Sequence, residues 1–354
     1  MTLQRLQVRQ LRCLDAVDLE LHPQSNFLYG LNGAGKTSVL EAIYLLSRGR
    51  SFRSRLNARL VQRGKDGFLI SAVAQSRGRT RRLGLEFKAG ALQLKVDGES
   101  GWRSSALSRL LPVHVLDPSM HSLVDAGPSE RRRFLDWAVF HVEQPYLETW
   151  RDYRRALVQR NKALKSGQNL AVIEAWTEQF ILAAERVHQT RRGFVQAWSE
   201  RVADVGKRLL GENISVIYRS GGFDGKGLAD ALRGSLERDR QRGMTHVGPH
   251  RADLAIRLND ADAKDAASRG QQKLIAAALI LGELQEFTAR SAEPGILLVD
   301  DPAAELDNRS LARLITELRA LPMQLLMTGI SEQNLEPFEV SRVFHVEQGA
   351  IRQD

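Results

Sequence analysis

The octapeptide Gly30-Leu31-Asn32-Gly33-Ala34-Gly35-Lys36-Thr37 lies near the start of the chain and decides its fold class. It fits the pattern G-x-x-x-x-G-K-[ST] of phosphate-binding loops, the Walker A motif. The short apolar run 26–29 leads directly into it, and Val39, Ile43 and Leu46 follow at helical spacing until Ser47-Arg48-Gly49. A strand before the loop and a helix after it are the context that an α/β nucleotide-binding fold provides.

The chemistry of this loop follows from what phosphate oxygens need. Its three glycines permit backbone angles that point several N–H groups inward, and the helix that follows adds its positive end. Lys36 is expected to reach the β- and γ-phosphates, and the Thr37 hydroxyl to bind Mg²⁺. The motif alone does not specify which nucleotide is bound. The residues predicted to hold the nucleotide, taken as ATP, are Gly30, Leu31, Asn32, Gly33, Ala34, Gly35, Lys36 and Thr37.

A second motif is the apolar stretch 296–299, which ends in Asp300-Asp301. Four apolar residues in a row are typical of a central parallel strand. Asp300 at its end is expected to hold Mg²⁺, directly or through water. Asp301 occupies the position of the catalytic base in ATPases that have a Walker A motif. Residues 305–307 follow at the distance of a loop that crosses to a second subunit, although acidic residues before a helix are usually ordinary caps.

The bulk composition limits the class of protein. The 354 residues are 43% hydrophobic and carry a formal net charge of +9, with a sequence pI of about 9.9. This basic excess favours an anionic partner such as nucleic acid or a membrane surface. No apolar run is long enough to span a bilayer, the N-terminus lacks the apolar block of a signal peptide, and the single Cys13 excludes an internal disulfide. We expect a cytoplasmic protein.

The middle of the chain predicts a change from strands to helices. Three short strands are expected at 68–73, 83–87 and 92–96. Two amphipathic helices follow, the first over about 146–164 and the second over about 180–209, and the polar break 165–169 lies between them. Helices joined by such a short turn should pack antiparallel as an arm. Gly193 and Gly206 weaken the second helix, because each costs roughly 1 kcal/mol relative to alanine.

A third motif, Ser268-Arg269-Gly270-Gln271-Gln272, lies between the other two and opens an apolar helix. Together with these three motifs, three further stretches occur in order: Gly49 to Arg53, Gly127 to Asp136, and Thr245 to Leu254. In these motifs the chain resembles the RecF family of bacterial recombination mediators, within the structural-maintenance and Rad50-like ATPase group. The resemblance covers nearly the whole length. It implies an ABC-type P-loop head of α/β class with a second, mostly helical lobe built on the antiparallel arm.

The resemblance assigns roles residue by residue. It implies that Ser268, Gly270 and Gln271 contact the γ-phosphate of ATP held by a second copy of the chain, with Asp307 near the same interface. Ser268 then joins Lys36, Asp300 and Asp301 as a catalytic residue. Arg269 replaces the glycine of transporter signatures, and Asp301 the usual glutamate. The switch position, which is a histidine in transporter ATPases, is expected at Thr328 or Ser331. No residue of this sequence can be assigned as the glutamine of the lid.

The same resemblance implies three segments along the chain. Residues 1–125 are expected to form the N-terminal part of the ATPase lobe with the Walker A motif. Residues 126–215 are expected to form the helical arm. Residues 216–354 are expected to complete the ATPase lobe with the signature, the paired acids and the loop at Asp307.

The implied function is that of an ATP-dependent DNA-binding protein. ATP and Mg²⁺ drive two heads together on duplex DNA or single/double-strand junctions, and slow, DNA-stimulated hydrolysis releases them. The implied partners are RecR and RecO, and indirectly the recombinase RecA, with no membrane. The purposes are DNA repair, replication, recombination and SOS induction, in a nucleoid-associated protein. Two alternatives share the motif order: the ATPase subunit of a membrane transporter, and a non-catalytic chromosome-organising head.

No sequence motif identifies which residues would contact DNA. Arginine-dense stretches occur at 48–55, 77–82 and 131–133, and any one of them can be either a DNA contact or a solvated surface. No zinc ligand set or helix-turn-helix pattern stands out, so recognition of backbone and shape is expected. His246 and His250 are expected to have a structural role beside the turn at Gly248-Pro249.

Overall fold

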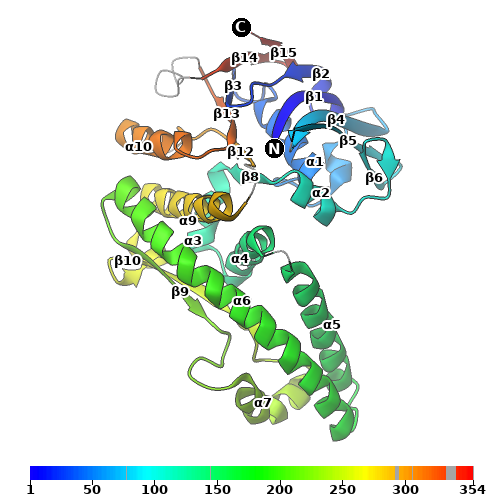
Figure 1. Ribbon diagram of the computed structural model, residues 1–354, viewed down its shortest axis with the longest axis vertical. Coiled ribbons are helices and arrows are strands. Elements are labelled where there is room, and N and C mark those ends of the chain that lie inside the picture. The colour runs from blue at the N-terminus through cyan, green and yellow to red at the C-terminus, as the bar shows by residue number, and fades with distance from the viewer. Residues whose placement is uncertain (77, 144, 292–294, 305, 332–339, 354) are drawn as a thin grey trace. The chain divides into compact units, whose positions relative to one another are not determined.

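The structure is a computed structural model that describes residues 1–76, 78–143, 145–291, 295–304, 306–331 and 340–353 (Figure 1). Arg77 and Glu305, which belong to two of the predicted motifs, lie outside the described residues. The chain forms two compact units. Unit 1 comprises residues 1–120 and 291–354, and unit 2 comprises residues 121–290.

Unit 1 contains an antiparallel sheet formed by the N-terminal third of the chain. Its six strands run in the order β2-β1-β4-β5-β6-β7. The alternating pattern of the sequence is seen directly, since Leu6, Val8, Leu83 and Leu85 are buried and their neighbours along the strands are more exposed. The strands are β1 (Thr2–Leu11), β2 (Leu14–Glu20), β4 (Gly67–Ser76), β5 (Arg79–Lys88), β6 (Ala91–Val96) and β7 (Glu99–Ser100).

The second sheet of unit 1 is mostly parallel and carries the two nucleotide motifs at its strand ends. Its order is β15-β14-β3-β13-β12-β8, and only the β14–β15 pair is antiparallel. The strands are β3 (Ser25–Tyr29), β8 (Val113–Leu116), β12 (Ile296–Val299), β13 (Gln324–Gly329), β14 (Arg342–Glu347) and β15 (Ala350–Gln353). β3 runs into the Walker A loop and β12 into Asp300, which confirms both predicted strands.

Helix α1 (Lys36–Arg48) is the central helix of unit 1 and contacts strands of both sheets. It is buried along almost its whole length and shares one apolar core with β1, β4, β12 and β13. It ends where the sequence predicted, and the capping Gly49 has a left-handed backbone. The remaining helical elements of this unit are η1 (Asn57–Leu60), α2 (Ser104–Leu110) and α10 (Asn308–Arg319), and η2 (Pro118–His121) ends at the boundary.

Unit 2 is built around a helical hairpin. α5 (Tyr146–Lys165) and α6 (Leu170–Leu210) pack against each other, joined by the turn 166–169 (Figure 1). The side chain of Asn169 caps α6 by accepting a hydrogen bond from the Val172 amide at 3.0 Å. Both predicted arm helices are thereby confirmed, and α6 starts earlier than expected. Gly206 has a packing reason, because a Cβ there would lie 2.5 Å from Cδ1 of Ile214.

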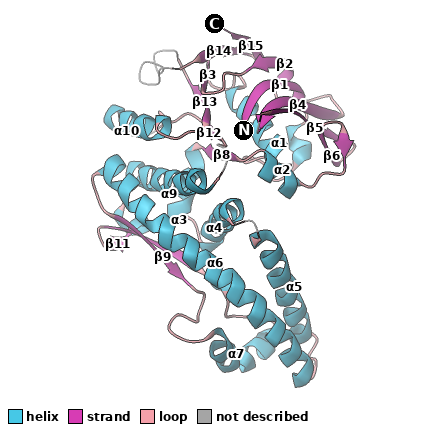
Figure 2. Ribbon diagram, viewed as in Figure 1, coloured by secondary structure: helices cyan, strands magenta, loops and turns pink. Residues whose placement is uncertain are grey.

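The rest of unit 2 surrounds this hairpin. A small sheet of order β11-β10-β9 lies here, while the larger sheets belong to unit 1 (Figure 2). Its strands are β9 (Ile214–Arg219), β10 (Asp253–Leu258) and β11 (Ala261–Asp262). The helices are α3 (Ser122–Asp125), α4 (Pro128–Val142), α7 (Leu228–Arg242), η3 (Pro249–Arg251), α8 (Ala263–Ala266) and α9 (Arg269–Arg290). Within the described parts of the chain, no helix combines the length and apolarity needed to cross a bilayer.

The boundary between the units differs from the expected segments. Residues 216–290, expected in the ATPase lobe, belong to unit 2 with the hairpin. The physical reason is packing: α9 lies along α6, and Trp198 of α6 donates a hydrogen bond to the Leu279 carbonyl at 3.0 Å. The signature motif at the start of α9 is therefore carried by the helical unit, while the Walker A loop and the paired acids are in the other.

Candidate nucleotide site

The Walker A loop of unit 1 is shaped by glycines with positive φ angles. The φ angles of Gly30, Gly33 and Gly35 are +150°, +82° and +119°. Gly30 also needs the absence of a side chain, because a Cβ there would lie 2.1 Å from the Val346 carbonyl oxygen of β14. The first intrahelical bonds of α1 run from Ser38 and Val39 to the Gly35 carbonyl. The amides before them are the donors that a helix start offers to an anion.

Lys36 is folded back onto its own loop. Its ammonium donates to the backbone carbonyls of Gly30 at 2.6 Å and Leu31 at 3.0 Å. Burial lowers the pKa of Lys36, and the negative charges of Asp301 and Asp300 act in the opposite direction. Both direct partners are neutral acceptors, so the site retains positive charge that a phosphate can neutralise.

Asp300 joins the two motifs of unit 1. The Thr37 hydroxyl donates to its carboxylate oxygens, at 2.9 Å to Oδ1 and 3.1 Å to Oδ2. The Thr328 hydroxyl donates to Oδ1 at 2.8 Å and accepts the Asp301 amide at 2.9 Å. Burial raises the pKa of Asp300, which the two threonine hydrogen bonds oppose. Of the two residues considered for the switch position, Thr328 is the one whose hydroxyl contacts the paired acids.

The donors around Asp300 suit a hard divalent cation. Magnesium prefers oxygen ligands and takes one or two protein groups together with phosphate oxygens and water. Thr37 Oγ1 and the Asp300 carboxylate are already in contact, so one ion can be shared by both. The half-buried carboxylate accepts hydrogen bonds from two neutral hydroxyls, and a cation would supply the opposite charge. The predicted metal pair, Thr37 and Asp300, therefore fits Mg²⁺, which would neutralise phosphate charge during turnover.

The remaining acidic residues have distinct positions. Asp301 follows β12 with a φ of +46°, an uncommon backbone conformation for a residue with a side chain. Asp307 caps α10, since its carboxylate accepts the amides of Arg309 at 2.9 Å and Ser310 at 3.0 Å. A further hydrogen bond from the Ser310 hydroxyl, with these amides, lowers the pKa of Asp307. Its observed role is thus that of a helix cap.

The signature residues of unit 2 form a reciprocal helix cap. The Ser268 amide donates to Gln271 Oε1 at 2.9 Å, and the Gln271 amide donates to Ser268 Oγ at 3.3 Å. This is a capping box at the start of α9. The Gln271 amide group also donates to Glu212, and Arg269 pairs with Asp125. Gly270 lies in the first turn of the same helix.

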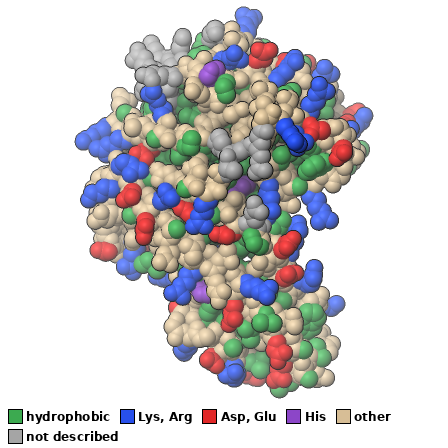
Figure 3. All heavy atoms as spheres, viewed as in Figure 1, with side chains coloured by type: hydrophobic (Ala, Val, Ile, Leu, Met, Phe, Trp, Pro, Cys, Tyr) green, Lys and Arg blue, Asp and Glu red, His purple; other side chains and the backbone are tan. Residues whose placement is uncertain are grey.

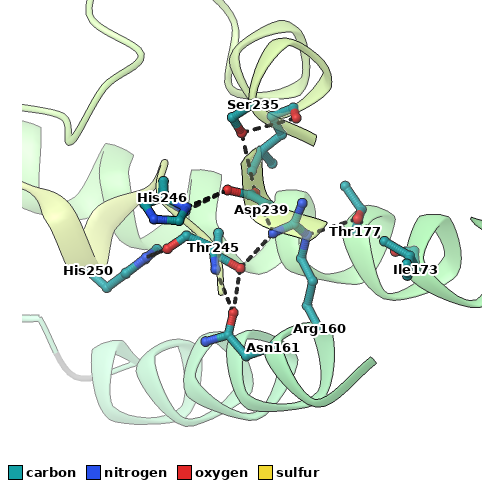
Figure 4. A network of polar contacts seen from close by, with 10 residues as sticks. Arg160, Asn161, Ile173, Thr177, Ser235, Asp239, Thr245, His246 and His250 are labelled. Atoms are coloured by element: carbon teal, nitrogen blue, oxygen red, sulfur yellow. Dashed lines mark hydrogen bonds and ion pairs between the residues drawn. The ribbon is translucent and has the colours of Figure 1, made fainter. Parts of the chain in front are cut away.

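His246 and His250 belong to a buried polar network of unit 2, as the sequence predicted (Figure 4). His246 contacts Asp239, which also pairs with Arg160 at 2.9 Å. His250 Nε2 lies 2.9 Å from the Thr245 carbonyl and must carry the proton, so Nδ1 accepts from the Tyr153 hydroxyl. Burial is the main reason that the pKa of His250 is lowered to about 4. Among the described residues, no group of three or more acids, histidines or cysteines could hold a metal.

One predicted arginine cluster is used inside unit 2. Arg131 pairs with Asp253 through two nitrogens, at 2.8 and 3.0 Å, and donates to the Ala126 carbonyl at 2.7 Å. Arg132 donates to the Ala252 carbonyl at 2.8 Å. Only Arg133 is well exposed. The stretch 131–133 thus ties α4 to the start of β10, and it is not a fully solvated run.

Two contacts near the Walker A loop were not predicted by any sequence motif. The β14–β15 hairpin lies against the Walker A loop, because the Gly349 amide donates to the Ala34 carbonyl at 2.8 Å. Glu41 of α1 is fully buried and pairs with Arg12 at 2.6 Å. The tight turn Gln348-Gly349 could have been predicted, but its hydrogen bond to the distant Ala34 could not.

Comparison with known proteins agrees with this geometry. Residues 2–352 match the family described as the RecF/RecN/SMC N terminal domain. The chain is 36% identical to the DNA replication and repair protein RecF of Shigella dysenteriae serotype 1 (strain Sd197) over 355 residues, covering 99% of each chain. The RecF protein of Salmonella typhimurium (strain LT2) matches with the same identity and coverage.

Solved structures agree with the sequence relatives. A RecF–ATP structure of the RecFOR pathway superimposes with a TM-score of 0.88 at 26% identity, over 100% of this chain and 97% of that chain. An Smc head bound to the winged-helix domain of ScpA shares the fold alone, with a TM-score of 0.61 at 13% identity and coverage of 100% and 97%. These matches confirm the α/β fold of the P-loop ATPase heads and favour the RecF reading over a transporter subunit. The chain belongs to the RecF family, within the wider RecF/RecN/SMC group.

Proposed function

We propose that this chain is an ATP-dependent DNA-binding protein of RecF type, active in DNA replication and repair. The arrangement of Lys36, Thr37, Asp300 and Thr328 carries this proposal, because it offers one buried cation and one half-buried carboxylate held by neutral partners. A triphosphate with Mg²⁺ supplies the missing counter-charges of both. The RecF–ATP structure, at 26% identity, supports the same ligand.

We infer a slow ATPase that uses hydrolysis as a switch. Lys36 would bind the β- and γ-phosphates, and Thr37 with Asp300 would hold Mg²⁺, which would neutralise phosphate charge. Asp301 accepts a proton from the attacking water as its base. An aspartate is one methylene shorter than the usual glutamate, so it positions this water less closely. Hydrolysis is expected to be weak without DNA and faster with it.

ATP is proposed to join two copies of the chain. Ser268, Gly270, Gln271 and Asp307 of one copy would contact the nucleotide held by the other. Because ATP then binds the dimer better than the monomer, dimerisation must depend on nucleotide by linkage. The position of Ser268 at a helix start supports this role, since such a site offers donors to an anion.

Sedimentation in the presence of ATP, ADP or no nucleotide tests the clamp. A dimer is expected with a slowly hydrolysed ATP analogue and a monomer in the other two conditions. Ser268→Arg should bind ATP with unchanged affinity and remain monomeric, while Asn169→Ala, which removes the helix-cap hydrogen bond to the Val172 amide in the same unit, serves as a control. Normal dimerisation of Ser268→Arg, or a wild-type monomer at saturating analogue, contradicts the proposed mechanism.

The DNA contact is proposed to involve the solvent face of α5. Five basic residues of this helix are exposed, namely Arg151, Arg154, Arg155, Lys162 and Lys165. On the face drawn in Figure 3, basic side chains are interspersed with acidic ones, so a contact there would neutralise a few phosphates and not a long tract of them. The DNA would be duplex or a single/double-strand junction. RecR and RecO would be direct partners of the protein, and RecA would be an indirect partner. SOS induction and association with the nucleoid would be the cellular consequences.

A salt titration of DNA binding identifies the contact surface. The slope of log K against log salt decreases in magnitude by about 0.9 for each phosphate that the protein no longer neutralises. Replacing Arg151, Arg155, Lys162 and Lys165 by glutamine should reduce the slope by about 2 to 4 on this scale. Matched neutralisations of Arg79, Arg81 and Arg82 on β5, and of Arg50, Arg55 and Arg59 after α1, compare the other clusters. An unchanged slope for the α5 variant assigns the contact elsewhere.

A further inference from the structure

Two signature side chains at the start of α9 are bound by acids of their own unit. Gln271 donates from Nε2 to Glu212 Oε1 at 2.9 Å, and Arg269 donates to Asp125 Oδ2 at 3.0 Å. Gln272, the third signature residue with N–H donors in its side chain, is buried and donates to backbone carbonyls. Carboxylate and phosphate oxygens accept the same donors. Both acids therefore occupy groups that a phosphate would use.

The contact with Asp125 is the weaker of the two. The Arg269 and Asp125 side chains are 69% and 29% exposed, and Asp125 also lies 3.9 Å from His121. An exposed ion pair contributes little, because water and salt screen it. Glu212 and Gln271 are both half-buried, so water competes less for their hydrogen bond. The Glu212 contact is thus the one that should matter for ligand binding.

Glu212 has a fixed position beside the signature. It follows Gly211, the left-handed residue that caps the C-terminus of α6. Its second oxygen, Oε2, accepts the side-chain amide of Asn259 at 2.6 Å. Asn259 lies in the turn between β10 and β11 and exchanges two hydrogen bonds with Asn213, at 3.0 and 3.1 Å. The carboxylate is therefore held between the end of α6 and this turn.

Both ends of the Gln271 amide are engaged as a result. Oε1 accepts the Ser268 amide at 2.9 Å, and Nε2 donates to Glu212. A γ-phosphate that approaches Nε2 would meet a fixed carboxylate that accepts from the same nitrogen. Because Gln271 is neutral, it does not offset the repulsion between these two anions. Glu212 thus opposes the contact that would join two copies of the chain.

We propose that Glu212 is an internal competitor of phosphate at the signature, which occupies Gln271 in the single chain and weakens ATP-dependent dimerisation. This inference rests on the proposed function, since it concerns the surface by which one copy would contact the ATP of another. Its consequence is a threshold. Two copies join only when the contacts with ATP outweigh the loss of the Glu212–Gln271 hydrogen bond and the repulsion by Glu212.

Glu212→Gln is the main test variant, because it removes the charge and keeps the length of the side chain. The dissociation constant of the dimer formed with a slowly hydrolysed ATP analogue should fall about tenfold, which is about threefold at each of two signature sites, as for one net hydrogen bond. Sedimentation over a range of protein concentrations measures this constant. The affinity of the monomer for the analogue should stay at the wild-type value, because Lys36 and Thr37 have other partners.

Asp265→Asn is the matched control for the loss of one negative charge. Asp265 is an exposed acid of α8, three residues before Ser268. Its loss should change the dimer constant by less than about twofold, because salt screens an exposed charge. An equally tight dimer in Asp265→Asn would assign the effect to overall charge and overturn the proposal. A Glu212→Gln dimer no tighter than that of wild type would overturn it too, since a merely structural residue gives that result.

Amide hydrogen exchange tests the hold on Gln271 without nucleotide. In Glu212→Ala the Gln271 side chain loses this anchor, so the Ser268 amide that donates to it should exchange about threefold faster. Amides in the middle of α9 should keep their wild-type rates. An unchanged Ser268 rate would overturn the inference even in a protein that dimerises with ATP. Wild-type and Glu212→Gln chains that both stay monomeric at saturating analogue would instead contradict the proposed clamp, while faster exchange would still show that Glu212 holds Gln271.

Discussion

The nucleotide site of unit 1 and the polar network of unit 2 both bury charged residues, yet they hold them in opposite ways. Lys36 and Arg160 are 8% and 1% exposed. Lys36 donates to two neutral carbonyls, and Asp300 accepts from two neutral hydroxyls. Arg160 instead meets the buried carboxylate of Asp239. Charges with neutral partners can still bind a ligand, whereas charges neutralised within the unit stabilise the fold.

The network of unit 2 reaches across several elements. Arg160 of α5 donates to Asp239 of α7, to Thr245 at 2.6 Å and to Thr177 of α6 at 2.9 Å. A second buried arginine, Arg191, pairs with Asp136 and donates to the Pro249 carbonyl at 2.7 Å. The family stretch 245–254 is therefore the connection between the hairpin and α7. Thr245 and Pro249 of this stretch therefore have a structural role, since each accepts a hydrogen bond from a buried arginine.

The largest effect should come from removing the Arg160 charge. Arg160→Met removes the arginine partner of the buried Asp239 and leaves it only the contact with His246 among its ion-pair partners in the described structure, which costs about 3–5 kcal/mol of stability. Urea denaturation followed by tryptophan fluorescence measures this, because Trp137, Trp150, Trp176 and Trp198 all lie in unit 2.

An exposed arginine of the same helix provides the control. Arg155 lies 3.9 Å from Asp152, and both side chains are mostly exposed. Arg155→Met should therefore change stability by less than about 0.5 kcal/mol. A loss of under about 1 kcal/mol in Arg160→Met would place the Arg160 pair in the same class as this surface pair, and the contrast between the two units would fail.

The next effect is a pH dependence of stability that arises in the polar network of unit 2. The pKa of His250 falls from 6.5 to about 4, mainly through burial. The unfolded chain then binds the proton more readily than the folded chain, so stability decreases as the pH falls below 6.5 and levels off below 4. The full loss is about 3 kcal/mol.

A difference curve isolates this histidine. His250→Gln removes the titrating group and keeps one donor and one acceptor for Thr245 and Tyr153. The stability of wild type minus that of His250→Gln, measured from about pH 7.5 to about pH 3.5, should decrease steadily on acidification. A flat difference would mean that His250 is protonated as easily in the folded chain as in the unfolded one, against its hydrogen bonds to Thr245 and Tyr153.

The sequence predicted the parts of both regions that depend on local pattern. The octapeptide 30–37, the strand before Asp300 and the two arm helices all follow from short motifs or periodic spacing, and each was found where expected. Contacts between distant segments could not be predicted in this way. Arg131 looked like one of a basic cluster, because its partner Asp253 is 122 residues away. The signature helix was expected with the ATPase lobe, because its packing along α6 depends on side chains from both helices.

The supports of the nucleotide site were missed for the same reason. Glu41 stands in an ordinary helical pattern, and only the folded chain shows that it holds Arg12 and Ser51. The choice between Thr328 and Ser331 also needed the structure, because both lie at or just after the end of β13 and either spacing was acceptable. Local pattern thus locates the residues predicted to bind the nucleotide, while the groups that orient them are set by tertiary contacts.

Lys36→Met gives the smallest free-energy change and the clearest separation between the two regions. Methionine keeps much of the length of the side chain and removes the charge that phosphate would pair with. ATP affinity should fall by about 1.5–3 kcal/mol, roughly ten- to a hundredfold, as for the loss of hydrogen bonds to a charged group. Stability should not fall, because the ammonium is buried against neutral carbonyls and its removal relieves a desolvation cost.

Isothermal titration of Lys36→Met with a slowly hydrolysed ATP analogue, together with urea denaturation, measures both quantities on one sample. Arg160→Met is the reciprocal control, since its folded fraction should bind the analogue with wild-type affinity. The contrary result is that Lys36→Met unfolds at lower urea while binding ATP with wild-type affinity. Lys36 would then stabilise the fold of unit 1 as Arg160 stabilises that of unit 2, and the proposed difference between a charge with neutral partners and a charge with an ionic partner would be wrong.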